Sequence, residues 1–193
     1  MKLAVITTPA FFGGEEELVR RLFDSGLERL HLRKPGATRE ELVRFLDSLR
    51  ASDRARIVLH DHFGLCLRYG CAGVHLNSRN PSLPAELEGV SVSRSCHSME
   101  ELRTWKENCN YLFLSPIYDS ISKEGYGSAF PREELEKARE SGLLDSRVYA
   151  LGGVSLEHID ELRGLGFGGV AVLGALWQSS DPVACLRALL SAL

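Results

Sequence analysis

Several common signatures are missing from this sequence, and each absence removes a class of protein. The cysteines (Cys66, Cys71, Cys96, Cys109 and Cys185) are odd in number and form no CxxC pair, so neither a disulfide framework nor a zinc knuckle is expected. No apolar run reaches the roughly 18 residues that a membrane span requires. The formal net charge is −3 without a basic stripe, which leaves nucleic-acid and membrane-surface partners without electrostatic support. Small molecules are therefore the expected ligands.

The beginning of the chain also lacks the features of a secretory signal. Met1-Lys2-Leu3 leads directly into a β-prone run, and we therefore expect a cytoplasmic protein. A chain of 193 residues with 44% hydrophobic content can bury a sizeable core, so we predict one domain over residues 1–193. The composition does not determine the oligomeric state, and a homo-oligomer stays open.

What the sequence does contain is a regular alternation of β-like and helical segments. The hydrophobic periodicity predicts strands at 3–7, 29–33, 56–60, 73–76, 90–95, 111–115, 148–151 and 169–174. Helical segments follow them at 15–25, 40–50, 63–69, 98–105, 132–140, 155–165 and 182–190, with Thr38 and Glu41 spaced as a capping box. Only residues 81–89 lack a helical pattern, and there we expect a loop or one loose turn.

This alternation predicts an α/β protein with a single (β/α)₈ TIM barrel of parallel strands. Parallel strands need crossover helices, and eight such units can close into a ring. The alternative is an open doubly wound sheet. It is disfavoured because no GxGxxG turn follows the first strand, where a dinucleotide-binding fold would be expected to show one.

Glycines at the ends of the last two predicted strands indicate a phosphate site. Gly152-Gly153 follows the seventh strand, and Leu173-Gly174 follows the eighth. Backbone N–H groups beside a helix N-terminus can bind an anion, and barrels commonly place their phosphate site after strands 7 and 8. The alternative is that these glycines only serve tight turns.

Polar residues gather at the carboxyl ends of the other predicted strands, where barrel enzymes carry their chemistry. Five of the six histidines follow or end a strand, and we expect them at one rim: His31, His60, His62, His75 and His97. The cations Arg33, Lys34 and Lys123 favour a ligand with several phosphate charges. Asp61 is the only acid at the ends of strands two to four. It could hold Mg²⁺ together with substrate phosphates, or it could form an ion pair with Arg33.

A transition-metal site is a second hypothesis for the same rim. Residues two apart on a strand face the same way, so His60 and His62 could share a metal with His31 or His75 as a third ligand. That arrangement would suit a metal-dependent hydrolase. A hydrolase of this kind would leave Lys123 and the glycines without a role. Metal analysis of the purified protein would distinguish the two hypotheses.

Taken together, these segments resemble the thiamine phosphate synthase family, which includes thiazole tautomerase relatives on the same barrel. The matching stretches keep family order from residue 3 to residue 177: His31-Leu32-Arg33-Lys34, Val58-Leu59-His60-Asp61, Gly73-Val74-His75-Leu76, Val92 to Ser98, Leu114 to Lys123, and Ala150 to Val154. The resemblance implies a transferase of thiamine biosynthesis. In that reaction aminopyrimidine-methyl diphosphate loses pyrophosphate, and thiazole phosphate takes its place to give thiamine phosphate.

The resemblance also implies roles for individual residues. Arg33, Lys34, Ser95 and Lys123 would handle the diphosphate, and His31 and His60 would lie against the substrate. Asp61, with Asn80, would hold Mg²⁺. Ser120, Ser122, Gly153 and the Leu173-Gly174 turn would bind the thiazole phosphate.

The sequence departs from the family pattern at several of these positions. The family has Gln at His31, Asn at His60 and a second metal-binding Asp at Asn80, so we expect a weakened Mg²⁺ site. It also places a basic residue two positions after the arginine, where this chain has Pro35. One alternative function is therefore a thiazole phosphate carboxylate tautomerase, although the tautomerase pattern has a histidine at Pro116. A non-catalytic binder of thiamine precursors is another.

Overall fold

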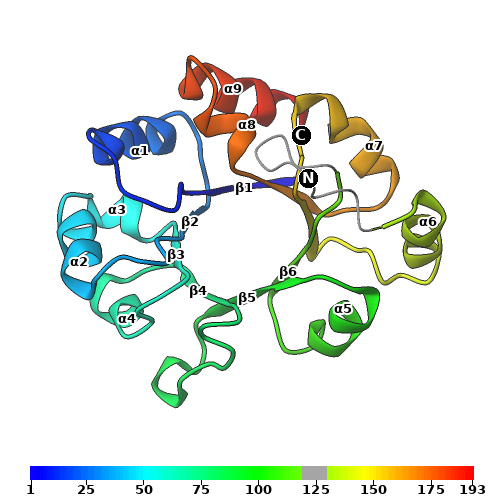
Figure 1. The fold of residues 1–193 in the computed structure, drawn as a ribbon, viewed down its shortest axis with the longest axis horizontal. Helices are drawn as coiled ribbons and strands as arrows, with labels where there is room; N and C mark the ends of the chain where they lie inside the picture. Colours follow the sequence, from blue (N-terminus) through cyan, green and yellow to red (C-terminus); the bar gives the residue numbers. More distant parts are fainter. Residues whose placement is uncertain (119–129) are drawn as a thin grey trace.

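The computed structural model describes residues 1–118 and 130–193. Parallel strands form a closed barrel in sequence order from β1 to β8 (Figure 1). Their bounds are β1 Lys2–Ile6, β2 Leu30–Leu32, β3 Ile57–Leu59, β4 Gly73–Leu76, β5 Ser91–Cys96, β6 Tyr111–Leu114, β7 Val148–Leu151 and β8 Gly169–Val172. The ring closes where β1 pairs with β8, with Leu3 opposite Val170. The predicted (β/α)₈ architecture is confirmed.

Helices surround this ring, as the view along the barrel in Figure 1 shows. They are α1 Glu15–Asp24, α2 Arg39–Asp47, α3 Ala51–Arg54, α4 Leu65–Tyr69, α5 Met99–Trp105, α6 Arg132–Glu140, α7 Ile159–Gly164, α8 Gly174–Trp177 and α9 Pro182–Ala192. Between β4 and β5 the described chain forms only the 3₁₀ turn Ala85–Leu87, in agreement with the loop or loose turn expected there. None of the described helices is long and apolar enough to cross a membrane.

Local sequence signals explain where several helices begin. The Thr38 side chain accepts a hydrogen bond from the Glu41 backbone N–H, and the Glu41 carboxylate accepts one from the Thr38 N–H, which confirms the capping box. At the start of α5, the Ser98 side chain accepts a hydrogen bond from the Glu101 N–H. The predicted helix 40–50 is wrong in one respect, because the chain breaks after Asp47 and starts a new turn, α3.

The barrel separates two apolar cores. The larger one lies between the strands and the helices and takes the outward side chains of β2 and β3, such as Leu30, Leu32 and Leu59. The smaller one fills the barrel itself and consists of Ala4, Ile6, Tyr111, Phe113, Tyr149 and Ala171, with Leu151 and Leu173 packed against it. Small residues on β1 and β8 face the three large rings of β6 and β7, so the interior is filled without a pore.

Candidate active site at the mouth of the barrel

Alternation along the strands decides which polar side chains enter the barrel. On β2, Leu30 and Leu32 belong to the outer core, and the residues between and after them face inward. His31 accordingly packs against the interior rings of Tyr111 and Phe113. The same parity places Arg33 on the inner side of the barrel and Lys34 on the outer side.

A cavity of about 780 Å³ lies at the carboxyl ends of the strands. Its apolar walls come from Ile6, Leu151, Leu173 and Trp177, and polar groups of Arg33, His60, His75, Ser95 and Arg79 also line it. We call it the mouth cavity. Its size is typical of small-molecule sites, which combine apolar walls with a few converging polar groups.

Three buried histidines form a hydrogen-bonded cluster directly below this cavity. Nδ1 of His31 lies 2.9 Å from Nε2 of His60, and Nε2 of His31 lies 2.8 Å from the Tyr111 hydroxyl. His75 is held on both sides, with Nδ1 2.9 Å from Ser93 Oγ and Nε2 2.9 Å from Ser95 Oγ. The His60 and His75 rings stack with their centroids 4.2 Å apart. Of these three, His60 and His75 line the mouth cavity.

Burial keeps all three imidazoles neutral at physiological pH. Loss of solvation lowers the pKa of His31 and of His60 well below 6.5, and the neighbouring His75 lowers both further. Burial and the nearby charges of Arg94 and Arg33 lower the pKa of His75 to about 3. The cluster therefore adds no charge to the cavity that His60 and His75 line.

The expectation of five histidines at one rim is met only in part: His60, His75 and His97 line the mouth cavity, and His31 and His62 do not. His31, His60 and His75 point into the barrel, and each is at most 4% exposed. His62 lies elsewhere, with Nε2 3.0 Å from the Ala37 carbonyl oxygen. The assumed alternation fails there because β3 ends at Leu59 and His62 has a φ of 53°.

The proposed metal pair of His60 and His62 is therefore not formed. Among the described residues, His31, His60 and His75 instead bring potential ligand nitrogens within 4.8 Å of one another. Both ring nitrogens of His31 and of His75 already have hydrogen-bond partners. We interpret the cluster as a hydrogen-bonded part of the interior, as expected of satisfied buried polar groups.

Lys34 does not reach the mouth cavity. Its ammonium lies 2.6 and 2.8 Å from the two carboxylate oxygens of Glu15, the first residue of α1. It also donates to the Ala10 carbonyl, and its side chain is fully buried. This agrees with its outward parity on β2. Lys34 therefore anchors the β1–α1 loop, whose residues Thr8 and Pro9 border the cavity.

Asp61 and Asn80 come together as expected, but a third residue joins them. Arg79 donates to both Asp61 oxygens, from Nε to Oδ1 and from Nη2 to Oδ2, each at 3.0 Å. Asn80 donates from Nδ2 to Oδ1 at 3.0 Å. The expected ion-pair alternative named Arg33 as the partner, and the structure places Arg79 there.

Ser95 and the glycine turns lie at the predicted end of the barrel. Ser95, Leu173 and Gly174 line the mouth cavity. Gly152 and Gly153 follow β7 with φ values of 93° and 63°. The backbone N–H groups of Gly153 and Gly174 donate to no acceptor within residues 1–118 and 130–193. Ser120, Ser122 and Lys123 lie outside the described residues.

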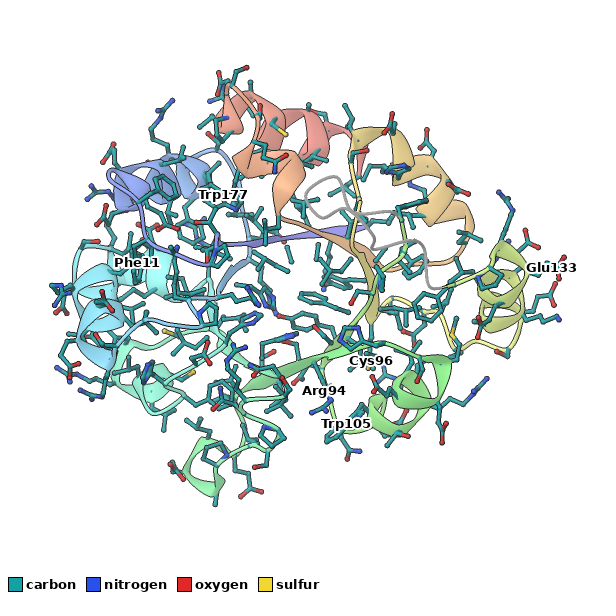
Figure 2. All side chains as sticks on the ribbon, in the orientation of Figure 1. Phe11, Arg94, Cys96, Trp105, Glu133 and Trp177 are labelled. Carbon is teal, nitrogen blue, oxygen red and sulfur yellow. The ribbon has the colours of Figure 1, made fainter. Side chains whose placement is uncertain are left out.

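The sequence reasoning missed two contributors to this site. Tyr111 supports His31 from inside the barrel, and its inward parity on a predicted strand would have indicated that position. Arg79 lies next to the predicted ligand Asn80, and its charge was the available signal. Arg94, a third arginine near the mouth, directs its guanidinium outward over Trp105 with a carbon-to-centroid distance of 4.1 Å (Figure 2).

Comparisons with known proteins identify the family of this chain. Residues 3–176 match the family described as thiamine monophosphate synthase. The solved thiamine phosphate pyrophosphorylase of Bacteroides thetaiotaomicron is 38% identical, with a TM-score of 0.91 over 100% of this chain and 97% of that one. Its counterpart from Pyrococcus furiosus, 23% identical with a TM-score of 0.79 over 99% and 94% of the two chains, shares the fold. A thiamine-phosphate synthase of Parasynechococcus marenigrum is 30% identical over 100% of this chain, which spans 56% of that relative's length.

Proposed function

Because this chain belongs to the thiamine monophosphate synthase family, we propose that it joins aminopyrimidine-methyl diphosphate to thiazole phosphate in thiamine biosynthesis. The observation that carries the proposal is the mouth cavity. It places cations and neutral polar groups beside apolar walls at the end of the barrel where the glycine turns lie. Two small phosphorylated substrates need that combination: charge for the phosphates and apolar surface for the rings.

The chemistry requires help mainly with the leaving group. The bond between the pyrimidine methylene carbon and the diphosphate oxygen breaks, and its electron pair leaves on that oxygen. The thiazole nitrogen then forms the new carbon–nitrogen bond. Fixed cations and hydrogen-bond donors at the departing diphosphate lower this barrier, and alignment of the two rings lowers it further.

We assign the diphosphate end to Arg33 and Ser95. Both line the mouth cavity, and the Arg33 guanidinium has no hydrogen-bond partner in the described part of the chain. Guanidinium groups bind phosphate oxygens with two parallel hydrogen bonds. Lys123 is assigned to the same group from the family resemblance alone.

His60 is the histidine that we assign to direct substrate contact. It lines the cavity, and His31 lies behind it at 2.9 Å. His31 thus acts as a positioning residue that fixes the His60 ring. Lys34 likewise acts through the β1–α1 loop that it anchors.

The thiazole phosphate is assigned to the glycine end of the cavity. Gly153, Leu173 and Gly174 follow β7 and β8. The N–H groups of the two glycines donate to no acceptor among the described residues and can donate to a phosphate. Ser120 and Ser122 complete this set in the family pattern.

Thiamine-phosphate synthases generally depend on Mg²⁺. As they lie, Asp61 and Asn80 fit the ion poorly, because both Asp61 oxygens accept hydrogen bonds from Arg79. A cation would first have to displace that guanidinium. We therefore propose a weakened Mg²⁺ site and assign no step to the metal.

A turnover assay with both substrates tests the proposal, with product separated by chromatography. Formation of thiamine phosphate supports it. Isomerised thiazole phosphate carboxylate without coupling would identify a tautomerase, and tight binding without turnover would identify a binder. Arg33→Ala should lower turnover at least about tenfold, since it removes a charged donor at the leaving group. Arg103→Ala, on the exposed face of α5, is the matched control and should leave the rate unchanged.

A further inference from the structure

Both oxygens of the Asp61 carboxylate accept hydrogen bonds from protein groups. Arg79 binds it with two parallel hydrogen bonds of 3.0 Å, and Asn80 adds a third of the same length. The Asp61 side chain is only 14% exposed. A bidentate guanidinium is the geometry that most closely occupies both oxygens of a carboxylate.

Asn80 is oriented as a donor in this arrangement. Its Nδ2 lies 3.0 Å from Asp61 Oδ1 and 3.1 Å from the His60 carbonyl oxygen. Both neighbours are acceptors, so the amide nitrogen and not the amide oxygen must face them. Asn80 therefore stabilises Asp61 as a hydrogen-bond donor, which is the opposite of a metal ligand.

The loop that carries Arg79 is fixed by hydrogen bonds. Asn77 and Asn80 exchange backbone hydrogen bonds of 3.1 Å in both directions. The Asn77 side chain accepts from the Arg79 N–H at 2.9 Å and donates to the His60 carbonyl at 2.7 Å. The guanidinium is thus positioned by its backbone as well as by Asp61.

Arg79 also faces the ligand space. It lines the mouth cavity together with Arg33, and its positive charge, added to burial, lowers the pKa of Arg33. Arg79 Nη1 has no hydrogen-bond partner in residues 1–118 and 130–193. Two guanidinium groups therefore line one cavity, and each has donors without a partner in the described part of the chain.

The charges of this group balance without a metal. In the family pattern, two carboxylates and Mg²⁺ sum to zero. Here one carboxylate, the neutral amide of Asn80 and the guanidinium of Arg79 also sum to zero. The neutral amide of Asn80 and the single charge of Arg79 together leave the group neutral, as a second carboxylate with Mg²⁺ would.

We propose that Arg79, held by Asp61, takes the place of Mg²⁺ and forms with Arg33 a metal-free subsite for the diphosphate group. The identity of the ligand rests on the proposed function. The subsite itself rests on the contacts of Arg79.

Binding of inorganic pyrophosphate, measured by calorimetry in EDTA and again in excess Mg²⁺, tests this directly. The wild-type chain should bind in EDTA, with Mg²⁺ changing the affinity less than about threefold. Arg79→Gln should weaken binding in EDTA roughly 10–100-fold, which is the effect of losing one charge-assisted contact. Arg103→Gln is the control and should bind as the wild type does. Circular dichroism of each variant establishes that it is folded.

A second variant reverses the proposed replacement of Mg²⁺ by Arg79. Arg79→Gln with Asn80→Asp restores two carboxylates and frees Asp61, so pyrophosphate binding should become dependent on Mg²⁺. Wild-type binding that requires Mg²⁺, no pyrophosphate binding under either condition, or unchanged binding by folded Arg79→Gln would each overturn the inference. Turnover is measured separately. If the chain binds pyrophosphate in EDTA but has no synthase activity, only the proposed function is contradicted.

Discussion

Nδ1 of His31 and Nε2 of His60 share a hydrogen bond of 2.9 Å inside the barrel, beneath the mouth cavity. Only one of the two nitrogens can carry the proton of that bond, so the pair is compatible with neutral rings and not with two imidazolium ions. His75 stacks on His60 and adds a third buried imidazole. The interior of this barrel is therefore sensitive to protonation.

We predict that the free energy of unfolding falls as the pH falls below about 6.5. In the unfolded chain each histidine titrates near that value, about 6.5. In the folded chain burial lowers the pKa of His31 and His60 well below it and that of His75 to about 3. Between those values the unfolded state binds protons that the folded state does not, so stability present above about pH 6.5 is lost on acidification.

Urea unfolding between about pH 7 and pH 5 measures this loss. Each of the three groups adds a slope that rises toward about 1.4 kcal/mol per pH unit as the pH falls below about 6.5. His31→Gln should reduce the slope by one such increment. A free energy of unfolding that does not change with pH would contradict the buried, neutral cluster.

A second prediction concerns the buried pair of Lys34 and Glu15. Lys34→Met should destabilise the chain by about 3–5 kcal/mol, because it leaves the Glu15 carboxylate buried without its partner. The double variant Lys34→Met with Glu15→Leu should recover most of that loss, since apolar residues of similar volume can replace a buried ion pair. Urea unfolding of the two variants measures both effects.

The same double variant decides between the two roles given to Lys34. A structural anchor predicts that turnover returns together with stability. If the double variant is stable but its turnover falls by more than about tenfold, Lys34 contacts the diphosphate as the family resemblance implied.

The barrel could be predicted from the sequence because its signals are local. Apolar runs, glycine stops and caps such as Thr38 recur along the chain, and eight parallel strands have few ways to close. The break between α2 and α3 could not be predicted, because the apolar periodicity of 40–50 continues through it. Tertiary packing places that break, and the sequence pattern does not record it.

The site was harder to predict because it depends on side-chain direction. Position along the chain placed both Arg33 and Lys34 at the end of β2, but strand parity sends one into the cavity and the other to Glu15. Strand β3 ends at Leu59, so the alternation of side chains does not continue to His62. The side chains of His60 and His62 therefore point in different directions. The pairing of Asp61 with Arg79 joins residues from two loops, and no spacing rule connects them.

The glycine turn after β7 gives a third prediction. Gly152 has a φ of 93°, and an added Cβ would lie 2.9 Å from Pro116 Cα and Cβ. Gly89 has nearly the same φ, 90°, with nothing within 4 Å. Gly89→Ala should therefore cost only the backbone strain of about 1–2 kcal/mol. Gly152→Ala should lower the free energy of unfolding clearly more than Gly89→Ala does, as measured by urea unfolding. Equal decreases for the two variants would show that the Pro116 contact adds nothing.

A fourth prediction follows from the family resemblance. Lys123→Ala should lower synthase turnover at least about tenfold, because a cation at the departing diphosphate stabilises its charge. Steady-state kinetics of the purified variant measure this. An unchanged rate would remove Lys123 from the diphosphate site and leave that charge to the arginines of the mouth cavity.

The last prediction uses two serines on the same strand. Ser95 lies at the carboxyl end of β5, lines the mouth cavity and hydrogen-bonds His75 Nε2 at 2.9 Å. Ser91 begins β5 and lines a separate cavity at the other end of the barrel. Ser95→Ala should lower kcat/KM roughly tenfold or more, since it removes a hydrogen-bond donor where the diphosphate is expected and frees one nitrogen of His75. Ser91→Ala removes the same hydroxyl from the same strand and should leave kcat/KM unchanged. Equal effects from the two variants would mean that chemistry does not take place at the carboxyl ends of the strands.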